Sequence, residues 1–250
     1  SLTDSNRGNN LVLQANETSA EASGQITLDS DGFTIGNDNA LRNTNGETYV
    51  AWCWKANEGT TSSNSDGSIT TTVQNNADAG FSIITYTGNG TVGATIGHGL
   101  GYVPDWFAVK KRSSGTTNWR VYHKSVDTGG NPQNFNVELN GNGVLDDRTE
   151  WNDTMPTSSV ISLNAHDSVN ASGSEYVCYA WTDIDAFSKF SYYTGTGSST
   201  DTPIIETGFE PAWVMIKVVN GNTGNWNIYD NARNTTNPRK EYLIANGNNA

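Results

Sequence analysis

The chain repeats itself at a spacing of 107 residues, and this repeat limits its fold more than any other feature. Identical residues recur at this spacing, or at one residue less, along the stretch between positions 86 and 140. The pairs include Tyr86 and Tyr193, Pro104 and Pro211, Trp106 and Trp213, Lys110 and Lys217, Trp119 and Trp226, and Asn140 and Asn246. A constant spacing over such a length indicates two copies of one structural unit.

A second set of matches has a spacing near 127 residues: Tyr49–Trp54 resembles Tyr176–Trp181, and Leu11–Leu13 resembles Val137–Leu139. The spacing changes because a Ser-, Thr-, Asn- and Gly-rich stretch after Trp54 has no counterpart, and we expect a long loop or a hairpin extension there. The matches divide the chain into the second half of one module (1–56), a loop or linker insert (57–80), a complete module (81–185) and the first half of a further module (187–250).

Two interpretations of the split ends follow. The chain is a window of a longer array, or residues 1–56 complete the C-terminal half-module. Completion could take place within the chain or in a neighbouring chain, as in donor-strand exchange.

Short alternating apolar runs predict β-strands, for example at residues 81–86, 106–110, 119–122 and 213–218. Asn-Gly pairs, which favour tight hairpin turns, occur six times, and no window shows a helical period. We therefore expect an all-β fold of antiparallel β-sandwich modules in tandem, jelly-roll or immunoglobulin-like, with about two module equivalents.

The charge balance excludes some classes of partner. The 14 Lys and Arg against 26 Asp and Glu, a net charge of −12, make a phosphate-binding basic surface and hence a nucleic-acid partner unexpected. No apolar stretch is long enough to span a membrane, and residues 1–25 show no signal-peptide pattern.

Several motifs together resemble a known family. They are Phe81–Gly90, Gly97–Gly101 with Pro104–Trp106, Asn118–His123, Tyr49–Ala56 and Phe187–Phe190. This combination, which covers nearly the whole chain, resembles an uncharacterised repeat module of structural proteins of tailed bacteriophages, common in marine phages. In that family the module sits in tail-fibre-like or other virion proteins, often beside concanavalin-like lectin domains.

The resemblance implies a place on the virion and carries over no catalytic residue. We therefore expect a non-enzymatic structural protein of a tail fibre or related surface appendage, assembled in the host cytoplasm, which displays β modules for host attachment. The expected partners are other virion proteins, copies of the chain itself in a homo-oligomer, and a cell-surface glycan. The alternatives are a bacterial extracellular adhesin or filament subunit and, third, a polysaccharide depolymerase.

Aromatic residues shared by both copies are expected to serve the core, so an unshared aromatic is the better candidate for stacking on a sugar ring. Trp151 is unshared and lies beside Glu150 and Asp153. We hypothesise that these three residues contact a ligand. Two carboxylates could also serve a glycosidase, although a solvated acidic loop is the commoner explanation for such a cluster.

No cofactor or dedicated metal site is expected. Asp29–Gly32 resembles a calcium loop, but position 12 of that loop would be Ala40 instead of Glu, so only an adventitious Ca²⁺ is foreseen. Gly88–Gly93 matches a dinucleotide motif but lacks a following helix, so a hairpin turn is expected. The two cysteines, Cys53 and Cys178, are expected to be free thiols, with a disulfide between them as the alternative.

Overall fold

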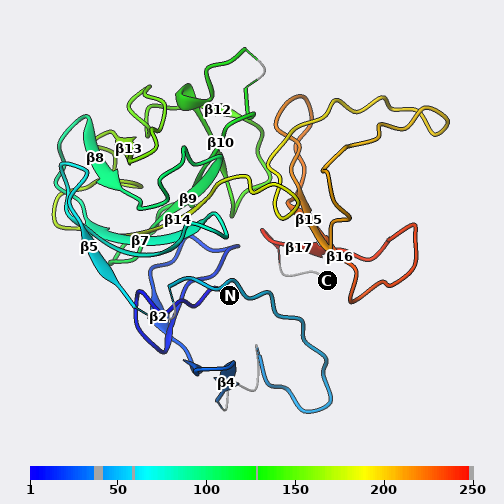
Figure 1. Cartoon of the computed structure of the whole chain (residues 1–250), viewed down its shortest axis with the longest axis horizontal. Helices are drawn as coiled ribbons and strands as arrows, with labels where there is room; N and C mark the ends of the chain where they lie inside the picture. Colours follow the sequence, from blue (N-terminus) through cyan, green and yellow to red (C-terminus); the bar gives the residue numbers. More distant parts are fainter. Residues whose placement is uncertain (37–41, 58–59, 128, 248–250) are drawn as a thin grey trace.

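The computed structural model describes residues 1–36, 42–57, 60–127 and 129–247, and these residues form an all-β structure. One helical element, the 3₁₀ turn η1 (Pro132–Asn134), occurs in these ranges. The centre of the fold is an eight-stranded sheet (Figure 1). In spatial order its strands are β12 (Asp146–Asp147), β11 (Phe135–Glu138), β10 (Arg120–His123), β9 (Trp106–Lys111), β14 (Glu175–Trp181), β7 (Phe81–Thr87), β6 (Thr71–Asn76) and β5 (Ser62–Asn64).

The smaller sheets surround this centre, and every strand pair in the described ranges is antiparallel. One parallel contact, an isolated bridge, joins Ile69, in the connection between β5 and β6, to Ile96 of β8. The smaller sheets pair β1 (Leu11–Val12) with β2 (Ala22–Ser23), β3 (Ile26–Leu28) with β4 (Phe33–Ile35), β8 (Ala94–Gly97) with β13 (Val160–Leu163), and β15 (Trp213–Ile216) with β16 (Asn227–Asp230) and β17 (Leu243–Ile244).

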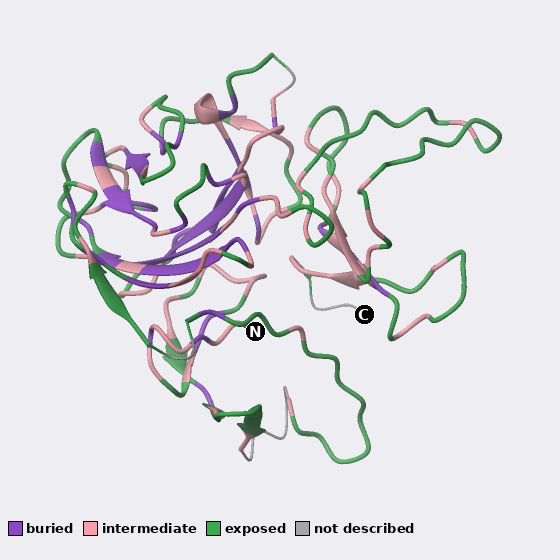
Figure 2. Ribbon diagram, viewed as in Figure 1, coloured by how far each residue is buried: buried purple, intermediate pink, exposed green. Residues whose placement is uncertain are grey.

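Alternation along the central strands gives the large sheet two apolar faces. On the first face, Phe107, Tyr122 and Tyr176 pack beneath β8, β13 and Trp151. The second face packs against the two ends of the chain, and its buried residues include Trp119, Val121 and Tyr179 together with Leu13 and Trp226. Figure 2 shows the resulting contrast between the buried central strands and the largely exposed chain over residues 42–55 and 191–212. The molecule thus holds its core on both sides of one sheet.

The all-β, antiparallel prediction is confirmed, whereas a sandwich of two full sheets and a pair of complete tandem modules are not evident. The layer over the first face consists of the two short strands β8 and β13, and the C-terminal part forms a three-stranded sheet. Residues 57–80, expected as a loop or linker insert or a hairpin extension, contain the hairpin β5–β6, which extends the large sheet. Thr71 and Val73 alternate inward there, which explains why a polar stretch becomes a strand.

The repeat does appear in the strand pairing: β9, β10 and β11 pair in the same order as β15, β16 and β17. Trp106 lies opposite His123 in β9–β10, and Trp213 lies opposite Asp230 in β15–β16, so both members of the pair shift by 107. In the described part of the chain, no strand of 1–56 pairs with a strand of 187–250. Completion of the C-terminal half-module, within the chain or by a neighbouring chain, stays a prediction.

Candidate functional site

Trp151, the residue singled out for sugar stacking, lies in the connection between β12 and β13 and is buried, with 1% of its surface exposed. Its ring meets Phe107 edge-on at a centroid distance of 4.8 Å, and its Nε1 donates to the carbonyl oxygen of Phe135 at 3.0 Å. A stacking platform needs an open ring face. The burial of Trp151 therefore argues for a core role, because the layer formed by β8 and β13 encloses it.

Glu150 is also buried and joins an ionic cluster over β10 and β11. Its Oε1 lies 3.2 Å from Nε of Arg120, and its Oε2 accepts a hydrogen bond of 2.9 Å from Asn136 Nδ2. Arg120 also pairs with the half-buried Glu138 at 2.7 Å. The Glu150 carboxylate is thus enclosed by protein groups, whereas a glycosidase acid must face its substrate.

His166 and Ser168 stand beside this cluster and superficially resemble a hydrolytic relay. His166 Nδ1 lies 2.7 Å from Ser168 Oγ and 3.7 Å from Glu150 Oε1. A relay requires the serine and the acid on opposite ring nitrogens. One nitrogen then accepts the serine proton while the other donates its N–H to the carboxylate. Here both partners face the same nitrogen, and this geometry cannot pass a proton from Ser168 to Glu150 through the ring.

Asp153, the third predicted ligand residue, is exposed. It follows Asn152, and both residues have positive φ values, 47° and 53°. Asp and Asn tolerate this conformation better than most residues, which accounts for an acidic, polar turn here. The structure therefore separates the three predicted residues: two are enclosed and one faces solvent.

A polar cluster that sequence reasoning missed ties the N-terminus to the large sheet. Arg7 donates through Nε to Asp4 at 2.5 Å and forms an ion pair with Glu21 at 2.7 Å. Tyr179 Oη donates to Asp4 Oδ2 at 2.6 Å, and Arg112 joins through Glu21 at 3.0 Å. Burial, followed by the nearby Asp4 charge, raises the pKa of Tyr179 far above its ordinary value, so this hydroxyl remains a hydrogen-bond donor.

The same side-chain arrangement recurs near the C-terminus. Arg233 donates through its backbone N to Asp230 at 2.8 Å, as Arg7 does to Asp4, and Nε–Oδ2 distances are 2.5 Å in both pairs. In both copies Arg Nη2 also donates at 3.1 Å to the carbonyl two residues before the aspartate. The shared Asp-x-x-Arg spacing was the sequence signal for this motif.

Each hairpin that carries a repeated Trp docks on the chain segment preceding it in the same way. Trp119 Nε1 donates to Gln14 O and Trp226 Nε1 donates to Glu138 O, both at 2.9 Å. Three further bonds match in the same way. The Thr117 N–H donates to Thr18 O at 3.1 Å, and the Gly224 N–H donates to Asn142 O at 2.9 Å. Lys110 Nζ donates to Thr18 O at 2.7 Å, as Lys217 Nζ does to Asn142 O at 3.5 Å, and the Glu21 N–H donates to Arg112 O at 3.0 Å, as the Leu145 N–H does to Val219 O at 2.9 Å. We call this set of four matched contacts the repeated junction.

The repeated junction also corrects one alignment. Every contact of the preceding segment shifts by 124 residues, so Leu13 corresponds to Val137, whereas sequence comparison aligned it with Leu139. The strand register agrees, since Leu2 bridges Leu13 as Val121 pairs with Val137. A shift of two residues keeps the same side chains on the same face of a strand, which explains why the sequence match looked equally good.

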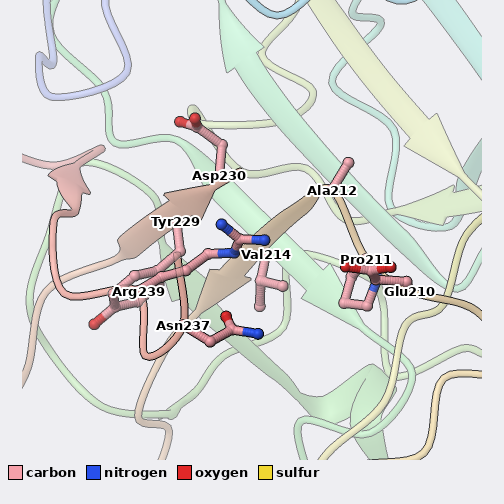
Figure 3. Close-up of a pocket in the computed structure, with 8 residues that line it drawn as sticks. All are labelled: Glu210, Pro211, Ala212, Val214, Tyr229, Asp230, Asn237 and Arg239. Atoms are coloured by element: carbon pink, nitrogen blue, oxygen red, sulfur yellow. The ribbon is translucent and has the colours of Figure 1, made fainter. Parts of the chain in front are cut away.

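The C-terminal sheet carries a hollow of about 230 Å³. Figure 3 shows its lining, with Val214 and Tyr229 on neighbouring strands and Arg239 reaching across them. Val214 and Tyr229 correspond to Phe107 and Tyr122, which are buried and stacked at 4.7 Å beneath the second layer in the complete unit. The hollow therefore lies at the position where the complete unit has buried core residues under a second layer.

The described ranges contain two cysteines and no cluster of metal-ligating side chains. No group of three or more His, Cys, Asp or Glu side chains there could hold a metal ion, and no described helix is long and apolar enough to cross a membrane. Cys53 is exposed and Cys178 is buried, and both are free, as predicted. Burial raises the pKa of the Cys178 thiol, which keeps it protonated.

Comparisons with known proteins place the chain in a family. No curated protein and no solved structure matches it. A family model described as "Domain of unknown function (DUF7483)" matches residues 1–250. The chain therefore belongs to the DUF7483 family.

Proposed function

We propose that this chain is a non-enzymatic structural protein of a tailed-phage particle, in a tail fibre or related surface appendage, whose β units present a surface for host attachment. The repeated junction is the observation that carries the structural part of this proposal. Four hydrogen bonds recur between each Trp hairpin and the segment before it. Contacts that recur along a chain let identical units follow one another, as fibrous and array proteins require.

The repeated side chains serve this assembly. Trp119 and Trp226 are buried, and both bind main-chain carbonyls, which every successive unit offers regardless of its side chains. Lys110, fully buried, donates to the carbonyls of Thr18 and Thr117 at 2.7 and 2.6 Å. Residues committed to such contacts are held in place and do not face a substrate.

For host attachment, the exposed aromatics are better candidates than Trp151. Tyr102, in the loop before β9, has 60% of its surface exposed, and Phe187 and Tyr192 each have 59%. An exposed ring can cover the apolar face of a sugar. Each such contact is weak, and copies displayed together on a particle would gain affinity through effective concentration. The target class is therefore a cell-surface glycan, and the phage attribution draws on the sequence resemblance.

Two experiments test the proposal with the full chain. Immunogold labelling of purified particles should place the protein on a surface appendage, and labelling confined to a bacterial surface would overturn the phage location in favour of an adhesin. A glycan array should show binding that Tyr102→Ala abolishes and Tyr102→Phe, which keeps the ring, retains. Binding unchanged by Tyr102→Ala would exclude this residue, and sugar release from bacterial polysaccharide would overturn the non-enzymatic assignment.

A further inference from the structure

Residues 49–54 have the sequence of a central strand but are not in a sheet. They match β14, which lies between β7 and β9 in the large sheet. Tyr176 and Val177 of β14 are fully buried, whereas their counterparts Tyr49 and Val50 are 47% and 38% exposed. The cost of exposing such large side chains to water favours a conformation in which they are covered.

The C-terminal sheet lacks a strand at the corresponding position. β9 has β10 on one side and β14 on the other, whereas β15 has β16 on one side and no described strand on the other. An unpaired edge offers its backbone N–H and C=O groups to any extended segment. Tyr193, which corresponds to the buried Tyr86 of β7, is likewise 46% exposed. The edge of β15 and the β7-like segment around Tyr193 therefore have no β14-like strand between them in the described structure.

One contact already joins the two parts. Trp54 meets Trp213 edge-on, with ring centroids 5.9 Å apart and an interplanar angle of 85°. In the large sheet the corresponding pair, Trp181 and Trp106, is also edge-on, at 5.1 Å and 66°, and the two residues lie directly opposite each other in β14 and β9. The end of the 49–54 segment thus contacts β15 through a tryptophan pair like the one between β14 and β9, and Trp54 also meets Trp181 edge-on at 6.1 Å.

From these observations we infer that Tyr49–Trp54 of the same chain adds to the free edge of β15 as an antiparallel strand, with Trp54 opposite Trp213. The occupant is this chain's own segment because the Trp54–Trp213 contact is made within one chain. In this register Cys53 takes the place of Ala180, which pairs with Phe107, so Cys53 comes to lie opposite Val214. Tyr49, Ala51 and Cys53 then face the hollow of Figure 3, on the side where Tyr176, Cys178 and Ala180 meet the core.

A disulfide measures this register directly, because Cys53 is native and exposed. In the full chain, Val214→Cys should form a disulfide between Cys53 and the introduced thiol under mild oxidation, since opposite residues of antiparallel strands have Cα atoms about 4.5–5.5 Å apart. Met215→Cys is the matched control: it moves the thiol one residue along β15 to the opposite face and should give at most about a tenth of that yield. Peptide mapping by mass spectrometry identifies the bond, and gel filtration assigns it to monomer or dimer.

Each other result overturns the inference. A bond found only in dimers would assign the edge to a second copy of the chain. Equal yields from the two variants, or none from Val214→Cys, would mean that the strand does not add in this register. A second pair of cysteines, Ala51→Cys with Ile216→Cys in a Cys53→Ser background, keeps the test decisive if Val214→Cys folds poorly. These two positions should lie opposite each other because they correspond to Cys178 and Val109, which pair in β14 and β9.

Discussion

Trp119 and Trp226 donate their indole N–H groups to backbone carbonyls at the same distance, 2.9 Å, in two separate parts of the chain. Both rings are buried. Their backbone N–H groups also match, since Trp119 donates to Asn140 Oδ1 at 2.8 Å and Trp226 to Asn246 Oδ1 at 2.9 Å. The two indoles, each directly before a strand of a different sheet, therefore have matching hydrogen-bond partners.

Replacing either indole with phenylalanine should destabilise the protein by a similar amount. Trp119→Phe and Trp226→Phe each remove one buried hydrogen bond and part of a ring, a loss of about 1–3 kcal/mol in the free energy of unfolding. Trp213→Phe is the control, because Trp213 Nε1 is a buried donor without a partner in the described structure and its removal should cost less. Urea denaturation followed by circular dichroism measures all three, and unequal effects of the first two would contradict the equivalence.

The N-terminal anchor depends on the Tyr179 hydroxyl. Tyr179→Phe keeps the ring but leaves a buried Asp4 oxygen with one donor fewer, so the unfolding free energy should fall by about 1–3 kcal/mol. Tyr242→Phe, at an exposed position, should change it by less than about 0.5 kcal/mol. Proteolysis should also cleave residues 1–20 faster in Tyr179→Phe than in wild type, and an equal cleavage rate would show that the anchor lies elsewhere.

Local patterns predicted the elements of this fold well. Alternation and turn residues located strands such as 81–86 and 106–110, because both signals act over a few neighbouring residues. The order of strands was not predictable in this way: β14 enters between β7 and β9, and such pairing depends on contacts between residues far apart in sequence.

The candidate site illustrates the same limit. A tryptophan beside two carboxylates looks alike in sequence whether it forms a sugar platform or a core. For Trp151 the deciding factor is the layer of β8 and β13, which comes from elsewhere in the chain. The pairing of Glu150 with Arg120 depends likewise on β10 lying beneath the loop, which no local pattern shows.

Trp151 should therefore contribute to stability. Trp151→Phe loses the Nε1 bond to Phe135 and part of the edge contact with Phe107, and we expect a loss of about 2–4 kcal/mol. Tyr102→Ala removes a large ring from an exposed loop and should cost less than about 0.5 kcal/mol. Chemical denaturation distinguishes the two, and a neutral Trp151→Phe would argue against the core role.

Glu150 should behave as a structural ion-pair partner. Glu150→Gln leaves the buried Arg120 guanidinium with Glu138 as its remaining carboxylate, so the unfolding free energy should fall by about 2–4 kcal/mol. Asp153→Asn makes the same chemical change at an exposed position and should alter stability by less than about 0.5 kcal/mol. If both variants unfolded at the same denaturant concentration as wild type, the ionic cluster would have no stabilising role.

His123 should make the protein acid-sensitive in a defined range. Burial, helped by the Lys124 charge and opposed by Asp105 and Asp183, lowers the pKa of His123 from 6.5 to about 4. The unfolded chain therefore binds more protons than the folded one between pH 6.5 and 4, and stability falls as the pH decreases through that range. His123→Asn removes the titration and keeps an acceptor for Ser125 N, which His123 Nδ1 binds at 3.0 Å. Between about pH 7 and pH 4 the wild type should lose about 1–3 kcal/mol more than this variant. Denaturation midpoints recorded across the range measure the difference, and parallel curves for the two proteins would show that His123 does not cause the acid sensitivity.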